Sequence, residues 1–287
     1  MGNTDLVRAS RDGDYFHYLW AARKALLLLN PLSGLEVLTI EGPSKSEFVE
    51  AVETGEEIVD VGEYYGSNKF SEASKIIYSQ LKHTTVHEDN SFKPSELEKT
   101  IKGFSKRYRK FLTLEKKKDI LEKLEFHFIS NRSINEDFYE SIKQLQETGQ
   151  VTNQPNLRKL EKYTTLKKED LEEYSNLEDG LLEQISTLQG KDLVDFIKLV
   201  KFPSQEPNYI AQREILAQDI AYYLAGDDVN APNELKELIH RKALSENKDT
   251  PEITRYDVLR ALKTNPDDLF PVKNLIKQLE NIVDRPI

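Results

Sequence analysis

This 287-residue sequence is best understood from one stretch of eight residues, Ile76-Ile77-Tyr78-Ser79-Gln80-Leu81-Lys82-His83. The stretch begins with apolar, β-branched and aromatic residues, a pattern typical of a buried β-strand. Gln80 and Lys82 stand two positions apart near its end, so on a strand they share one face of the sheet. We do not expect an amide and an ammonium group at the edge of an apolar sheet to be core residues. Their pairing indicates a functional site.

A second strand is expected at residues 58–61, and a polar loop at residues 66–74 separates it from the first. In a hairpin of this kind position 60 lies opposite position 80, so Asp60 shares a sheet face with Gln80 and Lys82. A carboxylate, an amide oxygen and a lysine are groups that bind Mg²⁺ and phosphate. The hairpin therefore predicts a metal and phosphate site.

Hydrolysis of a phosphodiester requires a divalent ion, side chains that hold it, and a cation or base that positions the attacking water. We expect Asp60 to be the main ligand of Mg²⁺ or Mn²⁺, Gln80 to bind or orient through its side-chain oxygen, and Lys82 to orient the water. Glu41, at the end of the predicted strand 35–41, is either a further catalytic carboxylate and metal ligand or a solvated strand end. All these residues are equally compatible with polar strand ends that face solvent.

Composition places broad limits on function. Hydrophobic residues make up 38% and charged residues 31% of the chain, as in soluble globular proteins. No apolar run approaches the roughly 20 residues that span a bilayer, and the absence of cysteine excludes disulfides and zinc thiolate sites. We expect a cytoplasmic protein. The net charge of −10 argues against a uniformly basic nucleic-acid binder but allows a local basic face.

Residues 95–112 form the clearest amphipathic helix, preceded by Pro94 and expected to begin with a capping box of Ser95 and Glu98. Its apolar stripe consists of Leu97, Ile101, Phe104, Tyr108 and Phe111. Its opposite face consists of Lys99, Lys102, Lys106, Arg107, Arg109 and Lys110. Residues 93–132 hold twelve Lys and Arg against six Asp and Glu. This local excess favours contact with the backbone of DNA, and a solvated helix surface is the alternative.

The remaining pattern predicts an α/β core followed by helices. A helix is expected from residue 14 to 29, with Asp12 and Asp14 at its start, where capping explains them. A short helix is expected near 46–53, a strand at 124–130 and a helix at 135–147. The polar break 150–155 suggests a core domain at 1–150 and a helical domain at 151–287. The helices expected there are 156–163, 167–174, 179–188, 191–199, 208–225, 233–245, 254–262 and 271–283. No nucleotide-binding GxxxxGK[ST] or GxGxxG loop is present.

Several segments together resemble a known nuclease family. They are 12–23 (DGDYFHYLWAAR), 39–42 (TIEG), 59–66 (VDVGEYYG), 80–84 (QLKHT), 95–97 (SEL) and 100–104 (TIKGF). The order Asp60, then Gln80-Leu81-Lys82, resembles the D…(E/Q)xK signature of the PD-(D/E)XK nuclease superfamily. The longer segments resemble the double-stranded DNA nuclease domain shared by CBASS effector nucleases and antiviral STAND NTPases of bacteria. Segments 241–244 (RKAL), 253–262 (ITRYDVLRAL) and 267–271 (DDLFP) resemble the helical part that follows this domain in STAND proteins.

The resemblance implies a restriction-endonuclease-like core and a metal-dependent, largely non-specific endonuclease that cuts double-stranded DNA. It carries Asp60, Gln80 and Lys82 over as the active site, and it makes Asp14 of the first helix a minor site candidate. Gln80 stands where many relatives have Glu, which leaves the number of metal ions open. The resemblance also implies an antiphage effector that works as a homo-oligomer, with an ATPase partner or a fused STAND NTPase region beyond this chain. The alternative function is a nuclease-like module without turnover that docks a partner protein through helices 156–283.

Overall fold

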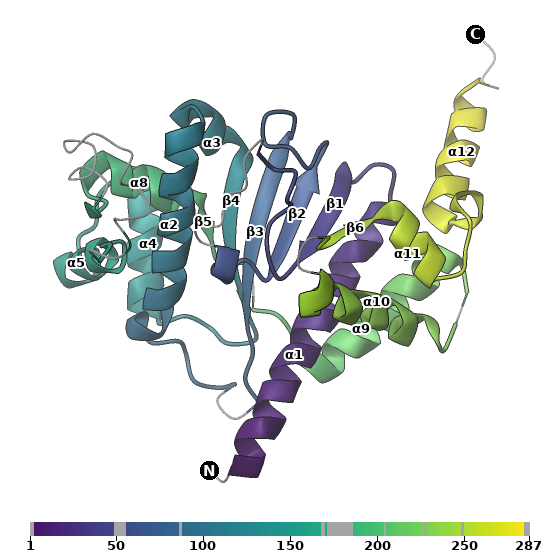
Figure 1. The fold of residues 1–287 in the computed structure, drawn as a ribbon, viewed down its shortest axis with the longest axis horizontal. Helices are drawn as coiled ribbons and strands as arrows, with labels where there is room; N and C mark the ends of the chain where they lie inside the picture. Colours follow the sequence, from purple (N-terminus) through teal and green to yellow (C-terminus); the bar gives the residue numbers. More distant parts are fainter. Residues whose placement is uncertain are drawn as a thin grey trace. The chain divides into compact units, whose positions relative to one another are not determined.

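The structure is a computed structural model that describes residues 3–48, 56–85, 88–167, 170, 186–203, 205–226, 228–247 and 250–283. It is an α/β fold in which hydrogen bonds order six strands as β5-β4-β3-β2-β1-β6 (Figure 1). The sheet is mixed, because β1 pairs antiparallel with β2 and β6 while β4 pairs parallel with β5. This confirms the expected α/β class. Among the described residues, no helix has both the length and the apolar character needed to cross a bilayer.

The chain divides into two compact units that interleave along the sequence. Unit 1 consists of Met1–Val49, Val61–Ile76 and Pro207–Ile287, and unit 2 consists of Glu50–Asp60 and Ile77–Glu206. The expected boundary between residues 150 and 151 falls inside unit 2. The two units are thus a different division of the chain, and the division into a nuclease domain and a helical domain remains a prediction.

Unit 1 joins the first helix of the chain to helices from its last third. Its elements are α1 (Asn3–Ala25), β1 (Leu35–Ile40), β2 (Val61–Tyr65), α9 (Tyr209–Leu224), α10 (Ala231–Ala243), β6 (Glu252–Thr254), α11 (Arg255–Ala261) and α12 (Phe270–Val283). Helix α1 packs against α9 and α10. Its apolar residues Phe16, Leu19 and Trp20 are buried. Arg23 ties α1 to α9, because its guanidinium donates to Gln212 at 2.6 Å and contacts the carboxylate of Asp219 at 3.3 Å.

Unit 2 is built around helix α2 and the strands beside it. Its elements are η2 (Glu56–Ile58), most of β3 (Lys75–Lys82), η3 (Pro94–Leu97), α2 (Glu98–Leu114), α3 (Lys117–Lys123), β4 (Leu124–Ser130), α4 (Glu136–Thr148), α5 (Gln154–Tyr163), α8 (Gly190–Leu199) and β5 (Val200–Lys201). The predicted apolar stripe of α2 is buried along its whole length. Phe104 stacks on Phe126 of β4 with ring centres 5.0 Å apart. Tyr108 contacts Phe196 of α8 at 5.5 Å.

Three predicted element starts are wrong. Helix α1 begins at Asn3 rather than near Asp14, so Asp12 and Asp14 lie inside the helix and do not cap it. The helix runs through Gly13, where an added Cβ would meet open space. A single glycine in an exposed helix costs only about 1 kcal/mol, which packing elsewhere outweighs. Strand β2 begins at Val61, not at residue 58, because residues 56–58 form a short 3-10 helix.

The third wrong start is that of the amphipathic helix. Ser95 and Glu98 form no capping box. Instead the first turn begins one residue earlier, at Pro94, and the carboxylate of Glu96 accepts a hydrogen bond of 2.7 Å from the backbone N–H of Lys93. Proline suits this first position because its missing N–H would have no partner inside the helix.

The sequence pattern predicts an all-helical chain beyond residue 150, and this prediction is wrong. It contributes β5 and β6 to the sheet, and both strands are too short to show an alternating pattern. In β6, Ile253 is fully buried and pairs with Leu38 of β1. Most of each of the predicted helices at 167–174, 179–188 and 46–53 lies outside the described residues. The other predicted helices of this half are confirmed within a few residues.

Candidate functional site

Helix α2 fixes the approach of the chain to Asp60. A Cβ added at Gly103 would lie 2.7 Å from Cγ1 of Ile58, so only glycine allows the helix to come this close to η2. Ile58 is buried, and Asp60 follows two residues later in a bend before β2. The close contact between α2 and η2 therefore sets the position of Asp60.

Asp60 is held against the segment Ser79-Gln80-Leu81 by two hydrogen bonds. Its backbone N–H donates to the carbonyl of Ser79 at 3.0 Å. Its Oδ2 accepts from the backbone N–H of Leu81 at 2.6 Å. Asp60 is half-buried. The prediction that positions 60 and 80 are close in space is confirmed, although Asp60 lies just before β2 rather than within it.

Gln80 differs from expectation because it is buried, with 3% of its surface exposed. Its side-chain Oε1 accepts a short hydrogen bond from the hydroxyl of Thr100 on α2. The prediction that Gln80 is not a core residue is therefore wrong. An amide can be buried in this position because Thr100 supplies a hydrogen-bond donor. Thr100 was not recognised from the sequence, since a threonine on a helix carries no pattern of its own.

Lys82 and Glu41 lie at the ends of their strands and are both exposed. Lys82 is the last residue of β3, in unit 2 with Asp60 and Gln80. Glu41 follows β1 in unit 1, where its φ of 55° is a left-handed conformation that few non-glycine residues adopt. Such backbone strain concentrates at functional sites.

Glu41 also lies in an acidic environment within unit 1. The pKa of Tyr18 is raised above its usual value, first by burial and then by the charges of Asp14 and Glu41. The structure therefore places the charges of both carboxylates around Tyr18 of α1. The ring of Tyr18 contacts that of His240 on α10 at 5.3 Å. Asp14, the minor candidate from the sequence, lies in the same region as Glu41.

The residues beside β3 offer a divalent ion one carboxylate, that of Asp60. Among the described residues, no group of three or more His, Cys, Asp or Glu side chains could hold a metal ion. Mg²⁺ commonly uses one or two carboxylates and completes its shell with water and substrate phosphate. Asp60 supplies such a carboxylate at the start of β2. The oxygen of Gln80 is buried and accepts from Thr100, so the amide would have to move before this oxygen could reach an ion from solvent.

The predicted basic face of α2 is only partly exposed. Arg107 and Arg109 are fully buried, so their assignment to a solvent-facing, DNA-binding surface is wrong. The guanidinium of Arg107 lies 5.3 Å from the ring centres of both Tyr78 and Phe111. Arg109 donates to the carbonyl of Thr164 at 2.6 Å. Helical spacing could not reveal this, because α2 is covered on a second side by the chain around Thr164.

Lys102 and Lys106 share one carboxylate, so the three side chains keep one net positive charge. Their ammonium groups lie 2.7 Å and 2.6 Å from the two oxygens of Asp170. Burial alone would raise the pKa of Asp170, but hydrogen bonds from both lysines and from the backbone of Lys167 hold it well below the usual range. Lys99 is exposed and Lys110 is half-buried. Of the predicted DNA-binding set, a contact with DNA stays a prediction for Lys99, Lys102, Lys106 and Lys110, and for the lysines paired with Asp170 it would have to compete with that ion pair.

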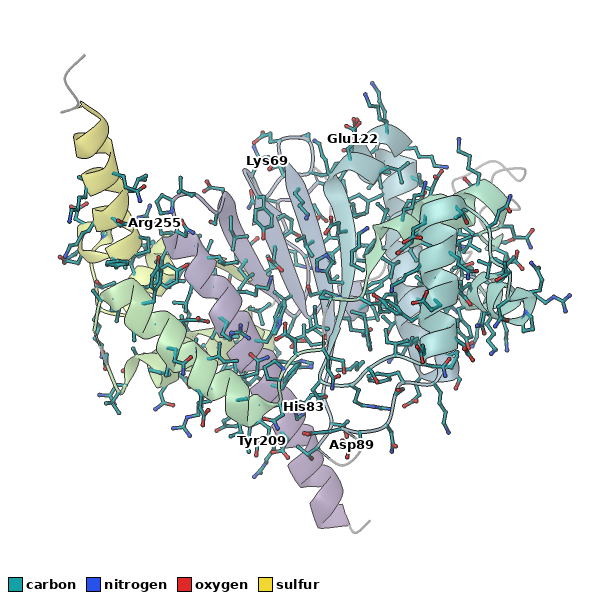
Figure 2. All side chains as sticks on the ribbon, turned by 180° about the vertical axis from the view of Figure 1, so that it is seen from behind. Lys69, His83, Asp89, Glu122, Tyr209 and Arg255 are labelled. Carbon is teal, nitrogen blue, oxygen red and sulfur yellow. The ribbon has the colours of Figure 1, made fainter. Side chains whose placement is uncertain are left out.

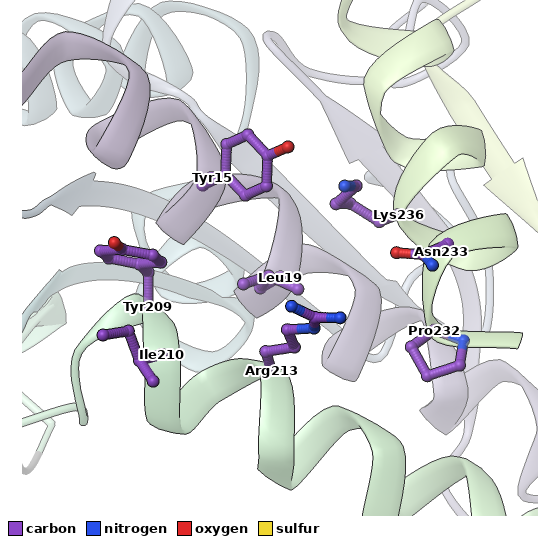
Figure 3. A pocket seen from close by; sticks show the side chains of 8 residues that line it. All are labelled: Tyr15, Leu19, Tyr209, Ile210, Arg213, Pro232, Asn233 and Lys236. Carbon is purple, nitrogen blue, oxygen red and sulfur yellow. The ribbon is translucent and has the colours of Figure 1, made fainter. Parts of the chain in front are cut away.

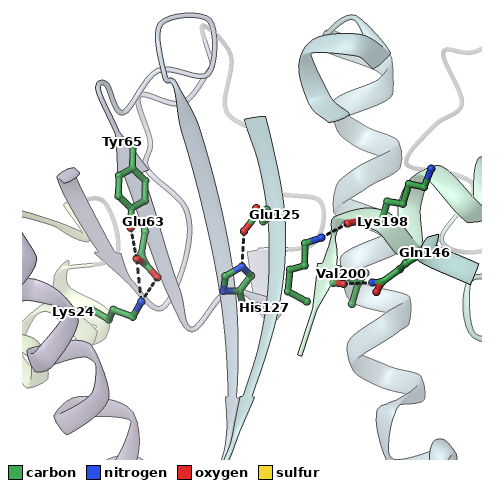
Figure 4. A network of polar contacts seen from close by, with 9 residues as sticks. Lys24, Glu63, Tyr65, Glu125, His127, Gln146, Lys198 and Val200 are labelled. Atoms are coloured by element: carbon green, nitrogen blue, oxygen red, sulfur yellow. Dashed lines mark hydrogen bonds and ion pairs between the residues drawn. The ribbon is translucent and has the colours of Figure 1, made fainter. Parts of the chain in front are cut away.

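Two further polar groups lie on the strands (Figure 4). In unit 1, Glu63 of β2 is fully buried, 3.3 Å from the ammonium of Lys24, and accepts a hydrogen bond of 2.8 Å from the Tyr65 hydroxyl. In unit 2, Glu125 and His127 of β4 share a hydrogen bond of 2.7 Å. Glu63 was not singled out from the sequence. The signal was its place between the apolar residues Val61 and Tyr64, which favours burial of the strand.

These features define an α/β protein with a mixed six-stranded sheet, in which Asp60 is hydrogen-bonded to Ser79 and Leu81 of β3. No protein-family model matches the chain, and no curated protein matches it. Among solved structures, the chain is similar to a Moraxella osloensis Cap4 SAVED/CARF-domain containing receptor, with a TM-score of 0.41 and 13% sequence identity. The match covers 90% of this chain and 49% of that one, so this chain spans about half the length of that structure.

Proposed function

We propose that the protein is a metal-dependent endonuclease that hydrolyses phosphodiester bonds of double-stranded DNA. The observation that carries the proposal is the hydrogen bond of 2.6 Å between Oδ2 of Asp60 and the N–H of Leu81. It fixes a carboxylate against the middle residue of Gln80-Leu81-Lys82. A carboxylate beside an amide and a lysine is the donor set that phosphodiester hydrolysis needs.

In this mechanism each side chain has a separate task. Asp60 would hold a divalent ion, which polarises the phosphate and lowers the pKa of a bound water. Lys82 is exposed, so its ammonium can approach the phosphate and offset the charge that develops on it. The contact between Thr100 and Gln80 keeps the amide oriented until substrate binds. Lys99 and Lys110 would contact the DNA backbone without reading its sequence.

The proposal includes the biological role that the sequence resemblance implies. In that role the protein is the nuclease effector of an antiphage system, and self-assembly or an associated NTPase controls it. The observation that supports control by assembly is the buried state of Gln80. A site whose amide is buried would be poorly active until a conformational change exposes it.

The experiment is cleavage of supercoiled plasmid at low salt with Mg²⁺, with and without EDTA. The native chain is compared with Asp60→Asn, which keeps an acceptor for the Leu81 N–H and removes the charge. The matched control is Glu122→Gln, the same chemical change at an exposed residue of α3 (labelled in Figure 2). We expect cleavage that needs the metal, falls on the order of a hundredfold in Asp60→Asn and is unchanged in Glu122→Gln. Equal metal-dependent cleavage by all three proteins would refute the assigned site.

A second function, a nuclease-like module that binds a partner without turnover, is favoured by one observation. The hydrogen bond between Thr100 and Gln80 withdraws the amide into the interior of unit 2. This alternative predicts no metal-dependent cleavage in any oligomeric state. Cleavage assays on fractions separated by size-exclusion chromatography distinguish the two functions.

A further inference from the structure

A cavity of about 230 Å³ lies in unit 1 among helices α1, α9 and α10 (Figure 3). Tyr15 and Leu19 come from α1, Arg213 from α9, and Asn233 and Lys236 from α10. Tyr209, Ile210 and Pro232 complete its wall. None of these residues takes part in the proposed cleavage of DNA. The cavity therefore calls for a separate explanation.

Two positive charges line this cavity without a carboxylate to neutralise them. In the part of the chain that the structure describes, neither Arg213 nor Lys236 forms an ion pair. The ammonium of Lys236 lies 4.5 Å from the centre of the Tyr15 ring. Figure 3 shows the polar ends of Arg213, Asn233 and Lys236 directed toward one space. Two cations that face one space favour an anionic ligand.

The backbone adds to the positive potential. Tyr209 and Ile210 are the first two residues of α9, and Pro232 and Asn233 belong to the first turn of α10. The N-terminal end of a helix carries a partial positive charge. Because two helices begin at the wall of one cavity, their dipoles add to the charges of the two side chains.

The rest of the wall is apolar and aromatic. Leu19 is buried at its base, whereas 48% of Tyr15 and 58% of Ile210 are exposed. Tyr209 stands across the cavity from Lys236 (Figure 3). Exposed apolar side chains beside converging polar groups are typical of sites that bind small molecules. The ligand should therefore combine an acidic group with an apolar body.

An adjoining groove of about 360 Å³ shares Arg213, Pro232 and Asn233 with the cavity. It also contains Asp228, whose carboxylate accepts a hydrogen bond of 2.8 Å from the backbone N–H of Asn230. A negative charge at that end opposes an anion. The acidic group of a ligand would lie at the Lys236 end.

We propose that this cavity binds a phosphate monoester with a small aromatic body. The charge of such an ester, about −1.5 to −2 at neutral pH, matches the two cations. The guanidinium of Arg213 and the ammonium of Lys236 bind the phosphate oxygens. The aromatic body lies against Leu19 and the rings of Tyr15 and Tyr209.

The test uses the full chain and phenyl phosphate as the probe, with inorganic phosphate and phenol as its two halves. Binding is followed by saturation-transfer NMR and by calorimetric titration. The variants are Arg213→Gln and Lys236→Met, and the matched controls are Arg158→Gln and Lys198→Met, which remove the same charges from exposed positions of α5 and α8. All five proteins are first compared by thermal unfolding, to confirm that each is folded.

We expect phenyl phosphate to bind at least about tenfold more tightly than either half, since each half makes only part of the contacts. Each cavity variant should weaken binding at least about tenfold, because each removes a hydrogen bond to a charged group. The controls should bind as the native chain does. The proposal is overturned by any of three results: no binding at millimolar probe, equal binding of phenyl and inorganic phosphate, or unchanged binding in either cavity variant.

Discussion

Asp60 shows what a short motif can and cannot predict. The spacing between Asp60 and Gln80 correctly predicts that the two positions are neighbours, because a hairpin fixes which residues face each other. It does not predict that Asp60 precedes the strand, or that its carboxylate binds the N–H of Leu81 at 2.6 Å. That detail depends on η2 and α2, which are distant in sequence or too short to recognise.

Arg107 is expected to stabilise the fold rather than to bind DNA. It is fully buried, and its Nη2 donates to the hydroxyl of Tyr78 at 3.3 Å. Arg107→Ala leaves a cavity and removes a donor to the Tyr78 hydroxyl, and should lower the free energy of unfolding by about 3 kcal/mol. The control Lys99→Ala, at an exposed position of the same helix, should change it by less than about 0.5 kcal/mol. Denaturant unfolding measures both, and similar small changes in the two variants would contradict the buried role.

Asp170 should make the free energy of unfolding depend on pH in the acidic range. Its pKa is lower in the folded protein than in the unfolded chain, where it is about 3.9. Its contribution is therefore fully present above that unfolded value and is lost as pH falls through it toward the folded pKa. We expect Asp170→Asn to be less stable than the native chain at pH 7, with the difference shrinking below about pH 4. A constant difference in unfolding free energy between pH 7 and pH 3 would contradict the ion pairs with Lys102 and Lys106.

Among the elements, α2 was the most predictable and also the most misleading. The spacing of Leu97, Ile101 and Phe104 identified its core face, because helical periodicity directly reflects burial on one side. The same periodicity assigned Arg107 and Arg109 to solvent. The spacing of residues within one helix does not show whether another segment covers its second side. Strands β5 and β6 were missed because two or three residues are too few to show a period of two.

Gly103 is expected to be essential to the close contact between α2 and η2. Gly103→Ala would raise helix propensity by about 1 kcal/mol. The new Cβ, however, would lie 2.7 Å from a side-chain carbon of the buried Ile58. We expect the variant to unfold at lower denaturant concentration and to bind Mn²⁺ more weakly, because the segment before Asp60 must shift. The control Gly226→Ala adds a Cβ that meets open space. A stabilised Gly103→Ala variant with native Mn²⁺ affinity would show that the contact does not position Asp60.

At the scale of the whole molecule, sequence order and spatial order differ. Unit 1 combines residues from the first quarter of the chain with Pro207–Ile287. A local sequence pattern does not show that the last part of the chain packs against the first. The α/β class could be predicted because periodicity identifies strands and helices one at a time. The partner of each element could not, because α1 packs on α9 and α10, nearly two hundred residues away.

A fragment of residues 1–150 should not fold by itself. It removes α9 and α10 from α1 in unit 1, and it removes α8 from α4 in unit 2. The apolar faces of α1 and α4 would then be exposed to water. We expect the fragment to be cleaved rapidly by proteases and to lack a cooperative thermal transition, whereas the full chain resists cleavage. A fragment that melts cooperatively would instead support the domain boundary at residue 150.

The central claim is that Asp60 holds a divalent ion beside Gln80-Leu81-Lys82. It is tested most directly by calorimetric titration of Mn²⁺ into the full chain, because binding can be measured even in a protein whose cleavage activity awaits assembly. We predict that the native chain and Glu122→Gln bind Mn²⁺ at one site, and that Asp60→Asn, with an unchanged unfolding temperature, binds at least about tenfold more weakly. Equal Mn²⁺ affinity in the native chain and Asp60→Asn would contradict the claim.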